Sequence, residues 1–180
     1  MQIADTSLPG VLMLTPRVFR DERGLFLESW QRDKFAALGL DVEFVQVNFS
    51  QSRRGTLRGL HYQIQQPQGK LIHVTQGRIL DVAVDLRRSS PCFGQHVMVE
   101  LDASAHRMLY VPPGFAHGFL ALEENTGVTY RCTDFYAPQH ERTLLWNDPA
   151  LGINWPLGGE PLLSPKDVAG VPLAQADCFA

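Results

Sequence analysis

The sequence predicts an all-β protein built as a sandwich, jelly roll or β-barrel. Twelve prolines and fifteen glycines interrupt short runs of Val, Ile, Leu, Phe and Thr, a pattern typical of many short strands. No internal repeat, low-complexity tract or linker separates these runs. A sandwich or jelly roll removes or shortens exposed sheet edges, and its interior offers a natural ligand pocket.

The sequence also predicts one helix, in the segment SWQRDKFAALGL at residues 29–40. Ser29 is suited to be the N-cap, Asp33 falls in the first turn, and Gly39 is suited to end the helix. The apolar contacts of this helix are predicted to be Phe35, Ala36 and Leu38. A second short helix is expected in the tail beyond Pro161.

The clearest strands lie in the middle of the chain. In HVTQGRILDVAVDL, apolar residues alternate from His73 through a Gln76-Gly77 turn and on to Leu86, which predicts a β-hairpin. Further strands are predicted in GQHVMVEL, RMLYVPP, HGFLAL and VTYRCTDFY, each bounded by turn residues.

Length and composition favour a single domain that spans residues 1–180. With 44% hydrophobic residues, a chain of 180 residues can bury about 70% of its unfolded surface. The net charge of −3 and the pI near 6.0 argue against a nucleic-acid partner, which usually requires a basic excess.

The cysteines and the first residues favour a soluble, cytoplasmic protein without a membrane partner. Cys92, Cys132 and Cys178 are odd in number and lack the spacing of a disulfide framework, so we expect reduced thiols. The start, MQIADTSLPG, lacks the features of a signal peptide, and no apolar run is long enough to cross a bilayer.

Two of the six histidines are candidates for chemistry, because each lies among Gly and large apolar residues. These are His61 in GLHYQ and His117 in GFAHGF, where an imidazole must be hydrogen-bonded to be tolerated. A histidine can accept a proton at neutral pH. A satisfied core histidine is the competing interpretation for both, and structural or solvated roles are expected for the other four.

A metal site is not expected. Metal-binding β-barrels commonly use a His-x-His pair, a carboxylate and a later His, but position 63 is Gln63 and no Glu follows at ligand spacing. The three or four ligands of such a site are therefore missing.

Positive charge gathers locally at Arg53, Arg54, Arg58 and Lys70, which indicates an anionic ligand. Arg suits phosphate oxygens, and Lys can stabilise a developing oxyanion. A solvated turn explains Arg53 and Arg54 better than a ligand does. In a regular strand, however, residues 58 and 61 would face opposite sides, so we expect either a bulge or a locally extended turn at Gly59 that re-aims a side chain.

Ten motifs occur in order over about residues 8–172: DERGLFLESW, FVQVNFSQS, GTLRGLHYQ, QGKLIHV, GRILDVAVDLR, SSPCFG, YVPPGFAHGF, TYRCTDFYAP, WNDPALGINWP and LSPKD. Together they resemble the dTDP-4-dehydrorhamnose 3,5-epimerase family, the cupin-type sugar-nucleotide epimerases of rhamnose biosynthesis. The resemblance implies a cupin-like jelly roll with a few short helices. It also implies an isomerase that acts on dTDP-4-dehydro-6-deoxy-D-glucose without a redox cofactor.

By this resemblance, His61 is the general base, Asp167 orients it, and Tyr130 is the opposing acid. Epimerisation beside a ketone removes a proton from one face of the sugar and returns one to the other, so two groups must flank the ring. Lys70 would stabilise the enolate at the carbon-4 oxygen. His117 would contact the sugar or support the base.

The resemblance also implies how the nucleotide is held. Arg23 and Arg58 would bind the diphosphate, and Tyr136 would stack on thymine. Members of the family exchange an N-terminal strand, so a homodimer is implied in which part of each site comes from the partner. The thymidine end would be bound by Glu28, Gln46 and Asn48, with Phe26, Glu141 and Lys166 as further candidates.

Three alternatives stay open at this point. Relatives with the same motifs include mono-epimerases that act on carbon 3 or carbon 5 only. A metal-dependent cupin oxygenase is opposed by the missing His-x-His pair. A non-catalytic module that binds a sugar nucleotide would use the same pocket without proton transfer.

Overall fold

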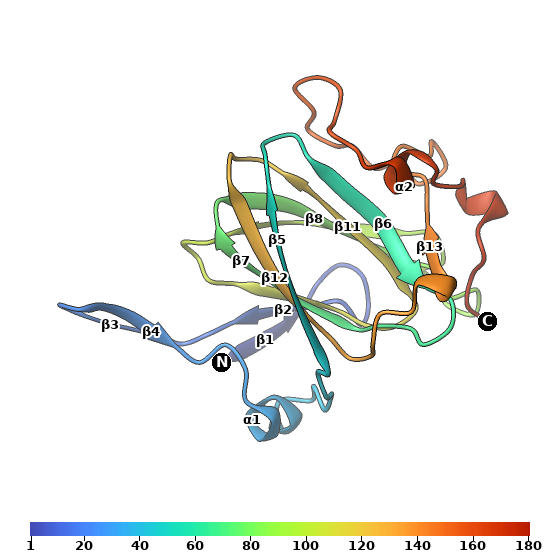
Figure 1. Cartoon of the computed structure of the whole chain (residues 1–180). Coiled ribbons are helices and arrows are strands. Elements are labelled where there is room, and N and C mark those ends of the chain that lie inside the picture. The colour runs from blue at the N-terminus through green and yellow to red at the C-terminus, as the bar shows by residue number, and fades with distance from the viewer.

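The computed structural model describes residues 1–180 and consists mainly of β-strands (Figure 1). The short helices are α1 (Arg32–Ala37) and α2 (Pro165–Val168), with 3₁₀ turns η1 (Pro138–His140) and η2 (Leu173–Gln175). The strands are β1 (Gln2–Asp5), β2 (Leu12–Thr15), β3 (Val18–Asp21), β4 (Gly24–Leu27), β5 (Gln46–Ser52), β6 (Leu57–Gln63), β7 (Lys70–Gln76), β8 (Arg78–Asp85), β9 (His96–Asp102), β10 (Met108–Val111), β11 (Phe115–Ala121), β12 (Thr126–Cys132) and β13 (Glu141–Thr143).

Two antiparallel sheets form the body of the molecule. One has the order β1-β2-β10-β7-β12-β5 and the other the order β13-β6-β11-β8-β9. β3 and β4 pair only with each other, and Figure 1 shows this hairpin projecting from the body; we call residues 18–27 the arm. The predicted all-β architecture with a few short helices is confirmed.

Three apolar clusters hold these layers together. Ile72 and Val74 of β7 pack with Ile79 and Ala83 of β8 in the cluster between the sheets. A second cluster packs the C-terminal segment, including Trp155, on the five-stranded sheet. The third packs α1 against the outer side of the six-stranded sheet. The two sheets thus form a core that leaves one end free for a pocket.

The predicted hairpin across residues 73–86 is wrong. β7 belongs to the six-stranded sheet and β8 to the five-stranded one, so the two strands do not pair. Gly77, at φ +73°, carries the chain from one layer to the other, and a Cβ there would lie 2.6 Å from Oγ1 of Thr126. Apolar alternation shows which side of a strand is buried. It does not show whether two successive strands pair in one sheet or lie in the two facing sheets of a sandwich, because both arrangements bury one side of each strand.

The helix at residues 29–40 is shorter than predicted. It begins at Arg32, and the N-cap is Gln31, whose side chain accepts a hydrogen bond from the backbone of Lys34. Ser29, the predicted N-cap, instead accepts a hydrogen bond from Nη2 of Arg131 on β12. Phe35 is buried and Gly39 follows the end of the helix at φ +92°, both as predicted. Leu38, by contrast, is exposed.

The predicted bulge at Gly59 is confirmed. Arg58 pairs with Phe119 and His61 pairs with His117, so β6 has one more residue than β11 between the two pairs. Gly59 adopts φ +131°, and a Cβ there would lie 2.5 Å from the Cα of Gly118. The extra residue re-aims the strand, and Arg58 and His61 therefore line the same pocket.

We predict that Gly118→Ala lowers the free energy of unfolding by about 1–3 kcal/mol, because overpacked sites must shift backbone or side chains. A Cβ at this position would lie 2.6 Å from the carbonyl oxygen of Arg58. Gly159→Ala is the control, since no atom lies within 4 Å of its Cβ position. Urea unfolding should separate the two variants; equal stability would contradict the tight approach of β6 and β11.

Candidate functional site

A pocket of about 500 Å³ is lined by both sheets and by α2. All but three of the site residues predicted from the sequence line it. They are Gln46 and Asn48 of β5, Arg58 and His61 of β6, Lys70 of β7, His117 of β11, Tyr130 of β12, Tyr136, Glu141 of β13, and Lys166 and Asp167 of α2. The exceptions are Arg23, Phe26 and Glu28, which lie on the arm or directly after it.

His61 and Asp167 form the central pair of the site. Nε2 of His61 lies 2.7 Å from Oδ1 of Asp167, and the carboxylate is almost fully buried. An ionised carboxylate only accepts hydrogen bonds, so the ring nitrogen that faces it carries the proton. In the neutral ring, Nδ1 of His61 is therefore the nitrogen with a free lone pair, as a general base requires.

The protonation of this pair is set by burial and by hydrogen bonds. Burial lowers the pKa of His61 below its ordinary value, although the hydrogen bond to Asp167 opposes this shift. Burial alone would raise the pKa of Asp167, but hydrogen bonds from His61, Ser164 and Gly59 hold it far below its usual range. At neutral pH the imidazole is thus uncharged and the carboxylate is ionised.

Tyr130 faces the pocket from the opposite sheet. It lies on β12 of the six-stranded sheet, whereas His61 lies on β6 of the five-stranded sheet. Burial raises the pKa of Tyr130, so the phenol keeps its proton at neutral pH. A molecule in the pocket would lie between a base and a proton donor.

Lys70 supplies a cation on the same side as Tyr130. Its Nζ donates to the carbonyl oxygen of His61 at 3.5 Å and forms no ion pair with a carboxylate. Burial lowers the pKa of Lys70, with Cys132, Glu141 and Asp81 acting against the shift. An ammonium group without a counter-ion favours negative charge on a nearby ligand atom.

His117 has a carboxylate partner of its own. Nε2 of His117 lies 2.9 Å from each carboxylate oxygen of Asp81, which is completely buried on β8. His117 and His61 are register partners on neighbouring strands. The floor of the pocket therefore has two histidines side by side, each held by a buried carboxylate.

One end of the pocket is lined by a polar network around Glu141. Its Oε1 accepts from Lys166 at 2.7 Å, and its Oε2 accepts from the hydroxyl of Tyr136 at 2.9 Å. Burial alone would raise the pKa of Glu141, but Lys166 and Tyr136 hold it below its ordinary value. The backbone of Tyr136 also donates to Gln46, which in turn donates to Asn48.

Arg58 lies at the same pocket with its guanidinium only partly engaged. Its Nε donates to the hydroxyl of Ser52, and its Nη2 donates to the carbonyl oxygen of Gln51. It makes no ion pair with a carboxylate, so its charge is available to an anion.

The three remaining predicted residues lie outside this pocket. Arg23 is paired with Asp21, and Glu28 is paired with Lys34. Phe26 is 68% exposed. The arm that carries Arg23 and Phe26 projects away from the body in Figure 1, and neither residue is among those that line the pocket of its own chain.

Sequence reasoning missed Gln68, Gly118, Phe119 and Ser164, which also line the pocket, and Asp81, which supports His117. For two of these residues, Asp81 and Ser164, the sequence itself contains a recognisable pattern. Asp81 interrupts an apolar strand, and a buried carboxylate requires a partner. Ser164 stands three residues before Asp167, which is the spacing of a helix capping box.

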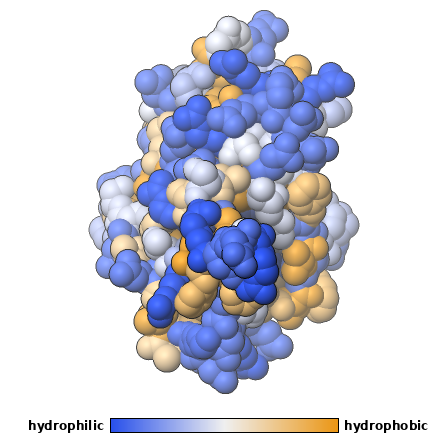
Figure 2. All heavy atoms as spheres, turned by 90° about the vertical axis from the view of Figure 1, so that its left-hand side faces the viewer, coloured by the Kyte–Doolittle hydropathy of each residue, from blue (hydrophilic) through white to orange (hydrophobic).

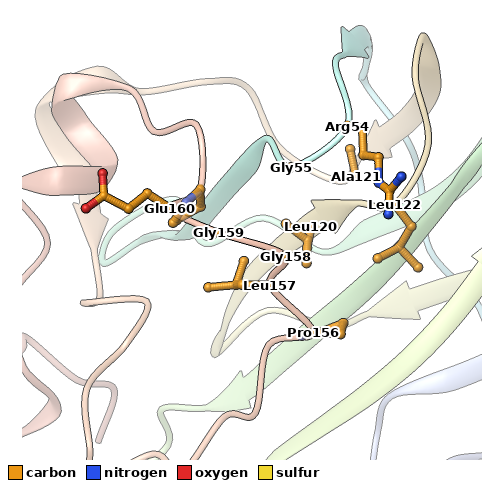
Figure 3. A pocket seen from close by; sticks show the side chains of 11 residues that line it. Arg54, Gly55, Leu120, Ala121, Leu122, Pro156, Leu157, Gly158, Gly159 and Glu160 are labelled. Atoms are coloured by element: carbon orange, nitrogen blue, oxygen red, sulfur yellow. The ribbon is translucent and has the colours of Figure 1, made fainter.

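A second pocket, of about 350 Å³, lies between the Arg54-Gly55 turn, the end of β11 and residues 156–161. Figure 3 shows Arg54 and Glu160 on opposite sides of it, with Leu157 and Leu120 between them. It contains no histidine, tyrosine or lysine. The chemistry of the molecule therefore concentrates in the larger pocket around His61.

The structure contains no group of three or more His, Cys, Asp or Glu side chains placed to hold a metal ion. None of its helices combines the length and the apolar character needed to cross a membrane.

Solved structures of similar proteins identify the class of protein to which this fold belongs. The crystal structure of dTDP-6-deoxy-D-glucose-3,5-epimerase RmlC from Legionella pneumophila, in complex with dTDP-4-keto-L-rhamnose, superposes with a TM-score of 0.94 at 46% identity. The match covers 98% of this chain and 94% of that one. The fold is thus that of the cupin-like sugar-nucleotide epimerases, and the protein is an enzyme of the epimerase class.

The family follows from the sequence comparisons. The family model described as dTDP-4-dehydrorhamnose 3,5-epimerase matches residues 5–175. The dTDP-4-dehydrorhamnose 3,5-epimerase of Pseudomonas aeruginosa is 53% identical over 180 residues, which is 99% of each chain. This chain belongs to the dTDP-4-dehydrorhamnose 3,5-epimerase family, as the resemblance in the motifs implied.

One structural neighbour differs in its described reaction. ChmJ from Streptomyces bikiniensis, a 3′-monoepimerase in complex with dTDP-quinovose, superposes with a TM-score of 0.88 at 38% identity. The match covers 94% of this chain and 86% of that one. The fold alone therefore does not separate mono-epimerases from 3,5-epimerases.

We predict that His61 titrates below its ordinary pKa of 6.5 and that Asp167→Asn lowers its pKa further. The carboxylate stabilises the imidazolium, and burial acts against it. An NMR titration of the ring, assigned with His61→Gln, measures both values. Asp102→Asn, on the surface, is the control; an unchanged midpoint in Asp167→Asn would contradict the coupling.

Proposed function

We propose that the protein epimerises carbons 3 and 5 of dTDP-4-dehydro-6-deoxy-D-glucose to give dTDP-4-dehydro-L-rhamnose. The observation that carries this proposal is the placement of the His61–Asp167 pair and Tyr130 on facing sheets around one pocket. Family membership supports the reaction class. The substrate is inferred from the descriptions of the relatives and from the charges in the pocket.

The first step is removal of a carbon-bound proton beside the ketone. Nδ1 of His61 takes this proton, and the electron pair of the broken C–H bond moves to the oxygen on carbon 4. Asp167 then stabilises the imidazolium that forms. Positioned acid–base groups of this kind contribute about 10²–10⁴-fold to a rate.

The enolate oxygen formed in this step would be stabilised by Lys70. Its ammonium group has no carboxylate partner within ion-pair distance, so the developing negative charge is its best partner. No electrons are lost or gained overall, so the route needs no redox cofactor.

The second step returns a proton to the other face of the ring. Tyr130 donates it from the opposite sheet, which inverts the configuration at that carbon. Exchange with solvent restores the phenol and the neutral imidazole before the second carbon reacts. His117, fixed by Asp81, would bind the sugar beside His61.

The nucleotide would lie toward the Glu141 end of the pocket. Tyr136 is half exposed and can stack on the thymine ring, beside Gln46 and Asn48. Arg58 and Lys166 would bind the diphosphate, which means that Lys166 exchanges its contact with Glu141 for phosphate oxygens.

A mono-epimerase that acts on carbon 3 only is the second candidate. The observation in its favour is the similarity to ChmJ, which shares the fold at 38% identity. Both reactions require the same base, acid and cation, so the pocket described above accommodates either.

We further propose that the protein works as a homodimer that exchanges its arms. Arg23 and Phe26 are exposed on the arm and do not reach their own pocket, so a second copy would receive them together with Glu28. Figure 2 views the molecule from the arm side and shows hydrophobic surface beside the hydrophilic tip.

Exposed apolar side chains at the edge of the six-stranded sheet also support the proposed homodimer. Val47 and Phe49 on the edge strand β5 are 61% and 64% exposed, and they neighbour Arg131 and Thr129 on β12. Arg131 also holds Ser29 at the base of the arm. A second copy would cover this apolar strip, which is otherwise an exposed edge.

We also propose that residues 1–180 act as one catalytic domain in the cytoplasm. Cys92, Cys132 and Cys178 are all free thiols, as expected in a reducing compartment. The pocket draws residues from Gln46 to Asp167, so most of the chain contributes to one site. Cell fractionation checks the compartment, and activity in an exported fraction would contradict it.

Incubation with the 4-keto sugar nucleotide in deuterated water should place deuterium at carbons 3 and 5. NMR of both positions checks this, and His61→Gln should slow incorporation by about 10²–10⁴-fold because the base is lost. His96→Gln, on β9 outside the pocket, is the matched control and should react like the parent.

The outcomes of this experiment separate the candidates. Label at carbon 3 only would identify a mono-epimerase. Binding of the nucleotide sugar without any label, in the parent as in His61→Gln, would leave a non-catalytic binding module and refute the proposed mechanism.

A mixing experiment tests the exchanged arms. Arg23→Ala and His61→Gln should each be nearly inactive alone. In a mixed dimer, one site combines an intact His61 with the partner's intact arm, so about a quarter of the parental sites should become active if subunits exchange freely. Assays of refolded mixtures measure this gain. No gain, despite mixed dimers in native mass spectrometry, would contradict arm exchange.

A further inference from the structure

The carboxylate of Asp167 is held from two sides. Its Oδ1 accepts from the ring of His61 at 2.7 Å and from the backbone of Gly59 at 3.1 Å. Its Oδ2 accepts from the hydroxyl of Ser164 at 2.6 Å and from the backbone of the same residue at 3.0 Å. Ser164 is therefore the only side chain, apart from the base itself, that donates to this carboxylate.

Ser164 also caps the N-terminus of α2. It is the N-cap of α2, and its hydroxyl oxygen accepts from the backbone N–H of Asp167 at 3.3 Å. A hydroxyl has one donor and two acceptor sites, so both contacts can exist together. In an ordinary capping box these contacts only fix the start of a helix. Here the third residue of the box is the carboxylate behind the base.

The hydrogen bond from Ser164 to Asp167 matters because the carboxylate that accepts it is buried. Asp167 is only 2% exposed, and a buried acceptor that loses a hydrogen-bond donor is costly. Ser164 itself lines the pocket. The direction in which Oδ1 points toward His61 thus depends on what holds Oδ2.

We propose that Ser164 is a positioning residue for proton transfer, whose hydroxyl aims the Asp167 carboxylate at His61 and limits the negative charge that the ring senses. This inference deepens the proposed function and rests on it. Ser164 does not touch the reacting carbon and acts only through Asp167. It would act equally at both epimerised carbons, because the same base serves both.

Loss of the hydroxyl has a defined consequence for the base. With one donor fewer, the carboxylate is a stronger acceptor for the imidazolium, so the pKa of His61 rises. Protonation then inactivates the base at a higher pH than in the parent, and the acidic limb of the kcat/KM profile moves upward. The less firmly aimed base lowers kcat by about tenfold, while KM stays within about twofold because the side chains proposed to bind the nucleotide and the sugar are unchanged.

Two substitutions separate positioning from helix capping. Ser164→Gly removes the hydroxyl but keeps an acceptable N-cap, which costs the helix little. Ser164→Thr keeps both the cap and the donor. We expect the Gly variant to melt close to the parent, with a lower kcat and a shifted acidic limb, and we expect the Thr variant to restore both kinetic properties.

The measurements are kcat and KM across pH and an NMR titration of His61 in each variant. A parental kcat and an unchanged His61 midpoint in Ser164→Gly would overturn the proposal, as would a lower melting temperature with an unaltered pH profile. If the Gly variant does not fold, Ser164→Cys, which keeps the size but donates weakly, should show the same shifts.

The titration also keeps this proposal distinct from the proposed function. If the parent incorporates no deuterium, the function fails, but a shifted His61 midpoint in Ser164→Gly still demonstrates the coupling from Ser164 through Asp167 to the ring. If the parent epimerises and the midpoint does not move, the function stands and only the role of Ser164 is refuted.

Discussion

The site depends on one buried carboxylate, that of Asp167. It joins two parts of the chain that are distant in sequence, the bulge of β6 and the short helix α2, through hydrogen bonds to Gly59, His61 and Ser164. A buried charge is tolerated only when it is paired and hydrogen-bonded. The same contacts that satisfy this requirement also fix the tautomer of His61, so one set of hydrogen bonds supports both the fold and the proposed proton transfer.

The sandwich supplies what a single sheet could not. His61 and His117 come from the five-stranded sheet, and Tyr130 and Lys70 come from the six-stranded one. Groups that we propose to act on opposite faces of a sugar ring are thereby held on opposite walls of one pocket. Rigid strands place these groups more precisely than loops would.

The errors in the sequence-based prediction have a common cause. The alternation across residues 73–86 correctly indicated buried faces, yet it could not tell whether β7 and β8 pair in one sheet or face each other across the core. The helix at residues 29–40 began later than predicted because Ser29 is engaged by Arg131, a contact between distant segments. Helix and strand propensities depend only on neighbouring residues, so they cannot reveal such long-range contacts.

By itself, the sequence determined the all-β class, the bulge at Gly59, and the residue types that line the pocket, since these follow from local composition, backbone freedom and ordered motifs. Only the tertiary structure decided that Asp81 supports His117 and that Ser164 holds Asp167. It also decided that the arm projects away from the pocket of its own chain. These features depend on distances between segments far apart in the chain, and burial gives them their energetic weight.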